Sequence, residues 1–160
     1  KASSMNPMIR HATEQDIPAI TMIIRKAFAE YEGKLDPPSS AKYESEQRVK
    51  ADLNEGGALV YEQAGEIVGC IFYHLYKDHI YLRRLSVAPE HRRQGIASAL
   101  LEAGEEFGRN QKLPEARLSV RIVLEDNINF YQRRGYRHFG YGTHEGYQQP
   151  TFVNLAKRLD

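Results

Sequence analysis

Three β-rich runs that follow one another closely constrain the fold of this chain most. They cover Ala58–Gln63, Glu66–Tyr76 and Ile80–Ala88, and only the short links "AG" and "KDH" separate them. Links this short can join only antiparallel neighbours, because a parallel pair needs a crossover of about a dozen residues or more. The runs therefore predict three adjacent antiparallel strands in one sheet.

A helix and another strand follow these runs and add a parallel pair. Residues Ile96–Asn110 have the apolar spacing of an amphipathic helix, and "ARLSVRIV" after it alternates polar and apolar residues as a strand does. A strand–helix–strand unit makes a right-handed crossover, which leaves its two strands parallel. The expected fold is α/β, with a mixed (α+β) sheet that is mostly antiparallel and contains one parallel pair.

Six further elements are predicted around this central unit. Ile9–Ala12 is expected to be a strand, and Thr13 the N-cap of a helix that the Pro/Ser-rich stretch "GKLDPPSSAKY" ends. The others are a helix over Glu44–Asn54 closed by Gly56-Gly57, a short helix over Asn127–Arg134, and strands over Arg137–Tyr141 and Thr151–Leu155. Without a repeat or a linker, residues 1–160 predict one domain, in which 1–7 are a disordered start or an expression-tag remnant.

Charge, cysteine and histidine content narrow the function classes. The 22 Lys+Arg nearly balance the 21 Asp+Glu, so the net charge of +1 does not favour nucleic-acid binding. The single cysteine, Cys70, excludes an internal disulfide and suits a reducing compartment, so a cytoplasmic location is expected. No apolar run approaches the length that spans a bilayer, so no membrane association is expected. The six histidines lack metal-binding spacing, and no metal is expected.

A basic turn directly before the predicted helix at Ile96 is the first candidate for a binding site. A helix N-terminus carries unpaired N–H groups and partial positive charge, which together favour a phosphate. Arg92 and Arg93 add charge there, Gly95 and Ala97 let the backbone approach closely, and Ser98 can donate a further hydrogen bond. In isolation, such a turn is more often a solvated surface bend. The Rossmann and P-loop phosphate motifs are both missing from the sequence.

The pattern R-x-x-G-x-A, Arg92 to Ala97, follows "LRRLSVAPEH" directly. The combination resembles the acyl-CoA-binding signature of the GNAT superfamily of N-acyltransferases. The predicted element order and the segment "NINFYQRRGYRHFG" also resemble the family. Other segments look like those of a bacterial subgroup with poorly defined substrates. The resemblance therefore covers nearly the whole chain. It implies the GNAT fold, in which helices lie on both faces of the sheet and the parallel strands splay apart to admit CoA.

The resemblance implies that acetyl-CoA is the co-substrate. Backbone groups of the strand before the signature would contact the pantetheine arm, and the signature turn would bind the pyrophosphate. The coenzyme-binding residues implied in this way are Leu85, Ser86, Val87, Arg92, Arg93, Gln94, Gly95, Ile96, Ala97, Ser98, Asn127 and Tyr131. The family's frequent asparagine lies seven residues before its tyrosine, where this chain has Leu124, so Asn127 either contacts the coenzyme or caps the short helix.

The implied reaction is direct attack of an amine on the acetyl thioester in a ternary complex. A backbone N–H near Val87 would stabilise the oxyanion, and Tyr131 matches the family's general acid, although on an amphipathic helix it also fits core packing. Many relatives carry a glutamate on the strand before the signature, where this chain has arginines. A water relay or Glu44 is therefore expected as the general base. Lesser candidates for this role are Glu30, Glu32 and His144.

The acceptor is predicted from the variable segments, Glu30–Glu46 and Gly142–Pro150. They contain Tyr31, Tyr43, Tyr141 and Tyr147 with Glu30, Glu32, Glu44 and Glu145. Aromatic walls with carboxylates suit a small primary amine that is cationic. The alternatives are a protein or peptide amine as acceptor, or a non-catalytic acyl-CoA-binding module. Cys70 fits a buried strand position better than a nucleophile, and a homodimer is implied because GNAT proteins often form one.

Overall fold

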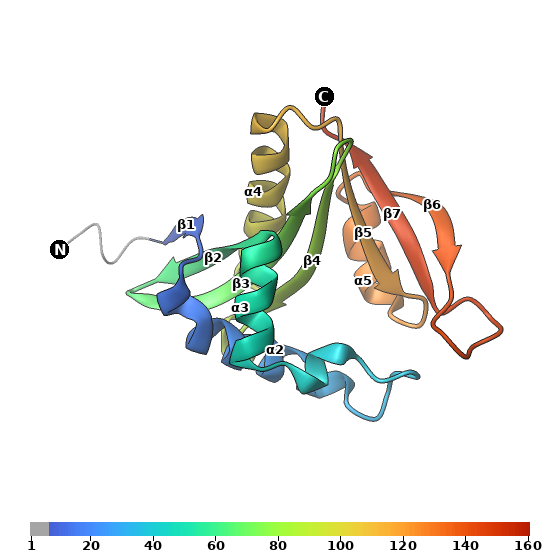
Figure 1. Cartoon of the computed structure of the whole chain (residues 1–160), viewed down its shortest axis with the longest axis horizontal. Coiled ribbons are helices and arrows are strands. Elements are labelled where there is room, and N and C mark those ends of the chain that lie inside the picture. The colour runs from blue at the N-terminus through green and yellow to red at the C-terminus, as the bar shows by residue number, and fades with distance from the viewer. Residues whose placement is uncertain (1–6) are drawn as a thin grey trace.

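A computed structural model of the chain describes residues 7–160 (Figure 1), so nearly all of the predicted disordered start lies outside the described residues. The α-helices are α2 (Ile17–Phe28), α3 (Glu46–Glu55), α4 (Ile96–Asn110) and α5 (Glu125–Gln132). The strands are β1 (Met8–His11), β2 (Gly57–Gln63), β3 (Glu66–Leu75), β4 (Ile80–Val87), β5 (Glu115–Arg121), β6 (Arg137–Gly142) and β7 (Phe152–Arg158). Within this range, no helix is both long and apolar enough to cross a membrane.

One mixed sheet organises the described chain. Its seven strands in residues 7–160 are ordered β1-β2-β3-β4-β5-β7-β6. The pairs β2–β3 and β3–β4 are antiparallel and the pair β4–β5 is parallel, as the connection lengths predict. The remaining pairs are antiparallel. The predicted fold class, a mostly antiparallel sheet with one parallel pair, is confirmed.

The parallel pair is short and opens into a gap. Only Ile80 with Ala116 and Tyr81 with Arg117 are paired, at the N-terminal ends of β4 and β5. Beyond them β4 stays paired with β3 and β5 with β7, and the two strands diverge in Figure 1. The gap therefore widens toward the C-terminal ends of the parallel strands, the side on which open sheets commonly bind ligands.

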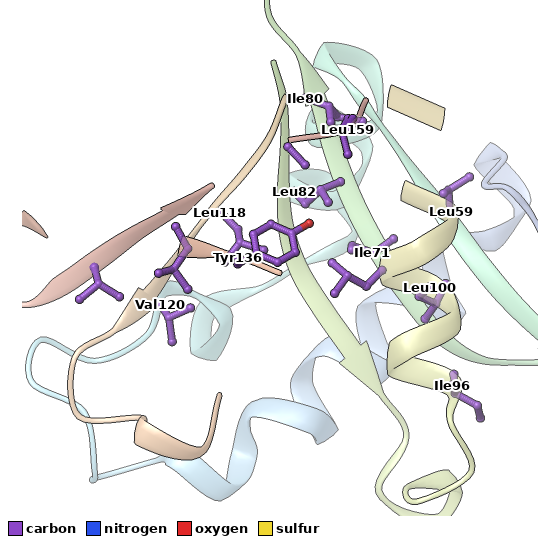
Figure 2. Packing of buried hydrophobic residues seen from close by; sticks show 14 of the residues in the cluster. Leu59, Ile71, Ile80, Leu82, Ile96, Leu100, Leu118, Val120, Tyr136 and Leu159 are labelled. Atoms are coloured by element: carbon purple, nitrogen blue, oxygen red, sulfur yellow. The ribbon is translucent and has the colours of Figure 1, made fainter. Parts of the chain in front are cut away.

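Helices cover both faces of the sheet, and this buries β2 and β3 on both sides. In β2, Val60 packs with α2 and α3, whereas Leu59, which points the other way, packs with α4. Figure 2 shows the apolar cluster on the α4 side of the sheet, in which Leu82 of β4, Leu118 of β5 and Leu100 of α4 pack with Tyr136. The buried Tyr136 therefore packs with both strands that border the gap.

Three predicted helix starts differ from the observed ones. The Thr13 N–H donates to the Asp16 carboxylate at 2.7 Å, but this capping box opens a 3₁₀ turn, and α2 begins only at Ile17, with Pro18 in its first turn. Helix α3 begins at Glu46, because the Ser45 hydroxyl accepts from the Arg48 N–H at 3.2 Å. Helix α5 runs two residues earlier than predicted.

Candidate active site

A cavity of about 530 Å³ lies where β4 and β5 separate, between the start of α4, α5 and the end of α2. It brings together most of the predicted coenzyme-binding residues. These are Leu85, Ser86, Val87, Arg92, Arg93, Gly95, Ile96, Ala97, Ser98, Asn127 and Tyr131. Neither Gln94, which was predicted to bind the coenzyme, nor Glu44, the predicted general base, is among the lining residues.

The backbone of Val87 is oriented toward the gap. The Ala88 N–H donates to the Val68 carbonyl oxygen at 2.8 Å, and Val87 is aligned with Gly69. In an antiparallel ladder, hydrogen-bonded residue pairs alternate with pairs that are not hydrogen-bonded. Because Ala88 bonds Val68, the next pair, Val87 with Gly69, is not hydrogen-bonded. The N–H and C=O of Val87 therefore point away from β3. They are free to bond a molecule that lies between β4 and β5.

Glu44 lies in a buried ion pair instead of the cavity. Its side chain is 1% exposed and that of Arg84 is 8% exposed, with 3.6 Å between Glu44 Oε2 and Arg84 Nε. Arg48 lies 3.7 Å away, and within residues 7–160 neither carboxylate oxygen accepts a hydrogen bond. A general base must come within hydrogen-bond reach of its substrate, so the position of Glu44 does not support the predicted role.

Arg84 marks a β-bulge just before the residues that face the gap. The register between β3 and β4 shifts between Cys70 and Phe72, and Arg84 has φ +57°. Its Nη2 also donates to the Ser40 hydroxyl at 2.6 Å. Bulges bend a strand and increase its twist, so this bulge contributes to the divergence of β4 from β5.

The predicted phosphate turn ends at the N-cap of α4. Gly95 occupies the N-cap with φ +79°, and Arg93 also has a positive φ of +66°. Arg92 donates to the Glu30 carboxylate at 2.9 Å and to the Ala27 carbonyl oxygen at 3.3 Å, which ties the turn to the end of α2. The first N–H groups of α4 thus adjoin a cavity lined by several arginines.

Replacing Gly95 with alanine is expected to lower the free energy of unfolding by about 1 kcal/mol, because a side chain disfavours the left-handed conformation. No atom lies within 4 Å of the added Cβ, so backbone strain, not a clash, causes the loss. Gly140→Ala is the matched control, since its conformation is not left-handed and its nearest neighbour is 3.9 Å away. Urea unfolding measures both variants, and equal stabilities for the two would contradict the expectation.

Tyr131 both packs against the core and lines the cavity. Its ring meets Phe130 at 5.1 Å and Tyr136 at 5.8 Å between centroids, both edge to face. Burial, and secondarily the charge of Tyr31, raise the pKa of the Tyr131 phenol above its ordinary value of 10.0. The hydroxyl therefore stays protonated at neutral pH, as a proton donor must.

Asn127 lies inside α5 and does not cap it. Leu124 is the N-cap residue, and the Asn127 amide donates to the Tyr31 hydroxyl at 3.4 Å. Of the two alternatives for Asn127, the structure excludes the cap. Tyr31 also lines two further cavities, of about 270 Å³ and 680 Å³, which border the 30–42 segment. These cavities are the candidate acceptor side of the site.

Several residues predicted for the acceptor side lie elsewhere. Tyr43 and Tyr141 are 60% and 61% exposed and line none of the three cavities. The Tyr147 hydroxyl donates to the Asp36 carboxylate, which joins the β6–β7 loop to the 33–39 segment. His144 contacts Thr151, and burial lowers its pKa. Within the described residues, no group of three or more His, Cys, Asp or Glu side chains could hold a metal.

Arg134 is a cavity residue to which the sequence assigned no role. It lines the cavity with Arg133, and both belong to "RRGY", directly after Tyr131. The sequence did contain one indication of this role, a pair of arginines at the end of a predicted short helix. Nothing in the sequence, however, shows that the end of α5 meets the start of α4.

Comparisons with known proteins agree with this geometry. A family model described as "Acetyltransferase (GNAT) family" matches residues 20–136. N-acetyltransferase family 8 member 2 of Rattus norvegicus is 32% identical over 117 residues, which cover 69% of this chain and 48% of the relative. The uncharacterized protein YdhI of Bacillus subtilis is 35% identical over 91 residues, which cover 55% of this chain and 53% of the relative. The chain thus spans about half the length of the curated relatives it matches.

Solved structures show the same fold. The PaiA N-acetyltransferase of Thermoplasma acidophilum, in complex with coenzyme A, has a TM-score of 0.78 at 19% identity over 96% of this chain and 99% of that chain. The ribosomal-protein-S18-alanine N-acetyltransferase of Escherichia coli has a TM-score of 0.77 at 21% identity over 96% of this chain and 94% of that chain. With a family match over most of its length, this chain belongs to the GNAT acetyltransferase family.

Proposed function

We propose that this protein is an N-acetyltransferase that moves the acetyl group of acetyl-CoA to a primary amine. One observation carries the proposal. A single cavity joins the gap-facing backbone of Val87, the N-terminus of α4 and the protonated phenol of Tyr131. These groups are what acyl transfer from a thioester needs, namely an oxyanion donor, an anion site and a general acid. The names of the N-acetyltransferase relatives support the same activity.

Each part of the cavity has a role in this proposal. The free edge of β4 at Leu85 and Val87 hydrogen-bonds the pantetheine arm, and the first N–H groups of α4 bind the pyrophosphate. The amine first loses its extra proton to a water relay or to Glu30 and then attacks the thioester carbonyl, while the Val87 N–H stabilises the oxyanion. The second amine proton leaves by the same route when the oxyanion collapses to the amide. Tyr131 then donates its proton to the departing thiolate. Of the predicted bases, Glu30 is the one that lines this cavity.

The acceptor is proposed to be a small primary amine. The two further cavities beside Tyr31, of about 270 Å³ and 680 Å³, have volumes that can hold a small ligand. Glu30 and Asp126 line both the main cavity and the larger of these two, so carboxylates border the path between them. They favour an amine that arrives as a cation. A protein or peptide amine remains the second candidate acceptor.

Release of free CoA from acetyl-CoA tests the activity, measured across small amines, polyamines, amino acids, aminoglycosides and short peptides. Acceptor-dependent release with one class identifies the acceptor type. Calorimetry with acetyl-CoA separates the alternatives: binding without turnover for any acceptor favours a non-catalytic acyl-CoA-binding module. The absence of acetyl-CoA binding would overturn the proposal.

Cys70 is not expected to carry the acetyl group. Its side chain is fully buried, and burial raises the pKa of the thiol to about 12. Because the thiolate is the nucleophile, an acetyl-cysteine intermediate is disfavoured. Cys70→Ala is expected to keep kcat within about twofold. Initial-rate plots should intersect, as for a ternary complex. A burst of CoA before acceptor is added would contradict this expectation.

Three further features belong to the same proposal. We infer that residues 1–160 form one GNAT domain and that the protein acts in the cytoplasm, which the single cysteine supports. The family resemblance supports a homodimer. Analytical ultracentrifugation tests the homodimer, with a single monomer species as the contrary result.

A further inference from the structure

Arg134 connects the two helices that flank the cavity. Its Nε and Nη2 donate to the Ser98 hydroxyl oxygen at 3.0 Å and 2.7 Å, and its Nη1 donates to the Phe130 carbonyl oxygen at 2.9 Å. The guanidinium also lies 3.8 Å from the centroid of the Phe130 ring. Since Ser98 belongs to the first turn of α4, these contacts join the end of α5 to the start of α4.

The two bonds from Arg134 determine what the Ser98 hydroxyl can do. A guanidinium has donors but no acceptor, so it occupies the lone pairs of the Ser98 oxygen. The hydroxyl proton must then point away from Arg134, and no group of residues 7–160 accepts it. Ser98 lines the cavity beside the unpaired N–H groups of α4. It is therefore oriented as a further donor toward an anion held there.

We propose that Arg134 is a positioning residue for the acyl donor. It holds the Ser98 hydroxyl as a hydrogen-bond donor to the pyrophosphate of acetyl-CoA. The inference rests on the proposed function, because it requires acetyl-CoA at the N-terminus of α4. Three hydrogen bonds and the stack on Phe130 hold the Arg134 guanidinium in place, so the proposed role of Arg134 is exerted through Ser98.

Binding measurements with two probes test this role without requiring an acceptor. CoA carries the pyrophosphate and pantetheine lacks it. Calorimetry with CoA and an NMR titration with pantetheine are applied to the wild type, Arg134→Gln, Ser98→Ala and the double variant. Each single change is expected to weaken CoA binding about tenfold, the size of one lost hydrogen bond to a charged group. The double variant should lose no more than either single one, and pantetheine binding should stay unchanged.

Two further variants sharpen the comparison. Arg134→Lys keeps a donor for Ser98 but loses the planar fork, so its CoA affinity should lie between the wild type and Arg134→Gln. Arg137→Gln removes an exposed arginine of β6 that does not line the cavity, and its CoA affinity should equal that of the wild type. This control separates positioning from a general loss of positive charge.

Each contrary result has a distinct meaning. Additive losses in the double variant would show that Arg134 contacts the phosphate directly, which overturns the positioning role. An equal loss of pantetheine binding would reduce Arg134 to a structural residue of the fold. Wild-type affinity in Arg134→Gln would overturn the inference and leave the proposed function standing. No CoA binding by the wild type would remove the proposed function and this inference together.

Discussion

Replacing Glu44 with alanine is expected to lower the free energy of unfolding by about 3–5 kcal/mol. The carboxylate is 1% exposed and faces Arg84, whose side chain is 8% exposed. Removing one member of a buried pair leaves the other charge without compensation in a poorly solvated place, which costs far more than the pair contributes. Because Arg84 stands at the bulge of β4, the loss also loosens the strand that borders the cavity.

Urea unfolding followed by circular dichroism measures this effect, with Glu32→Ala as control. The Glu32 side chain is 65% exposed and lies 3.9 Å from Lys42, so its loss should cost about 0.5 kcal/mol or less. The double variant Glu44→Met with Arg84→Met removes both charges and should recover most of the stability. A loss below about 1 kcal/mol in Glu44→Ala would show that the pair is solvated.

A second variant at position 44 distinguishes a structural role of Glu44 from the catalytic role predicted from the sequence. Glu44→Gln keeps the shape of the side chain and removes its charge. If Glu44 were the general base, a folded Glu44→Gln protein would lose about 100-fold or more in kcat. In the buried-pair role, the variant loses stability, while the fraction that remains folded keeps its kcat.

Local sequence patterns predicted most of the fold. The links between β2, β3 and β4 are too short for any pairing but the antiparallel one, and the crossover through α4 determines the parallel pair. The insertion of β7 between β5 and β6 was not predicted. That order depends on contacts between segments distant in sequence, which strand periodicity does not encode.

The candidate site was predictable where its residues are neighbours in sequence. The segment from Arg92 to Ala97 leads directly into α4, which begins at Ile96, so the position of the N-terminus of α4 follows from the sequence. The contacts of Arg92 with Glu30 and of Arg134 with Ser98 join distant segments, so they required the structure. Glu44 was predicted to lie at the pocket because it follows the Pro/Ser-rich loop that was expected to border the acceptor site. Its burial depends on the partner that β4 supplies.

Replacing Tyr131 with phenylalanine is expected to lower kcat for acetyl transfer by about 100-fold or more, the range of general acid catalysis. The ring contacts with Phe130 and Tyr136 do not involve the hydroxyl, so stability and CoA affinity should stay near those of the wild type. Tyr141→Phe is the matched control, because this tyrosine is 61% exposed and does not line the cavity. Its kcat should not change.

The pH dependence of kcat gives a second test of the same residue. An acid must be protonated to act, and the pKa of Tyr131 lies above its ordinary value of 10.0 because its phenol is buried. Raising the pH from about 7 to 10 should therefore not reduce kcat through Tyr131. A fall of kcat well below pH 10 that Tyr131→Phe abolishes would show that the phenol is more solvated than its burial indicates. Unchanged kcat in Tyr131→Phe would exclude the phenol as the general acid and leave the thiolate to depart unprotonated or with a proton from water.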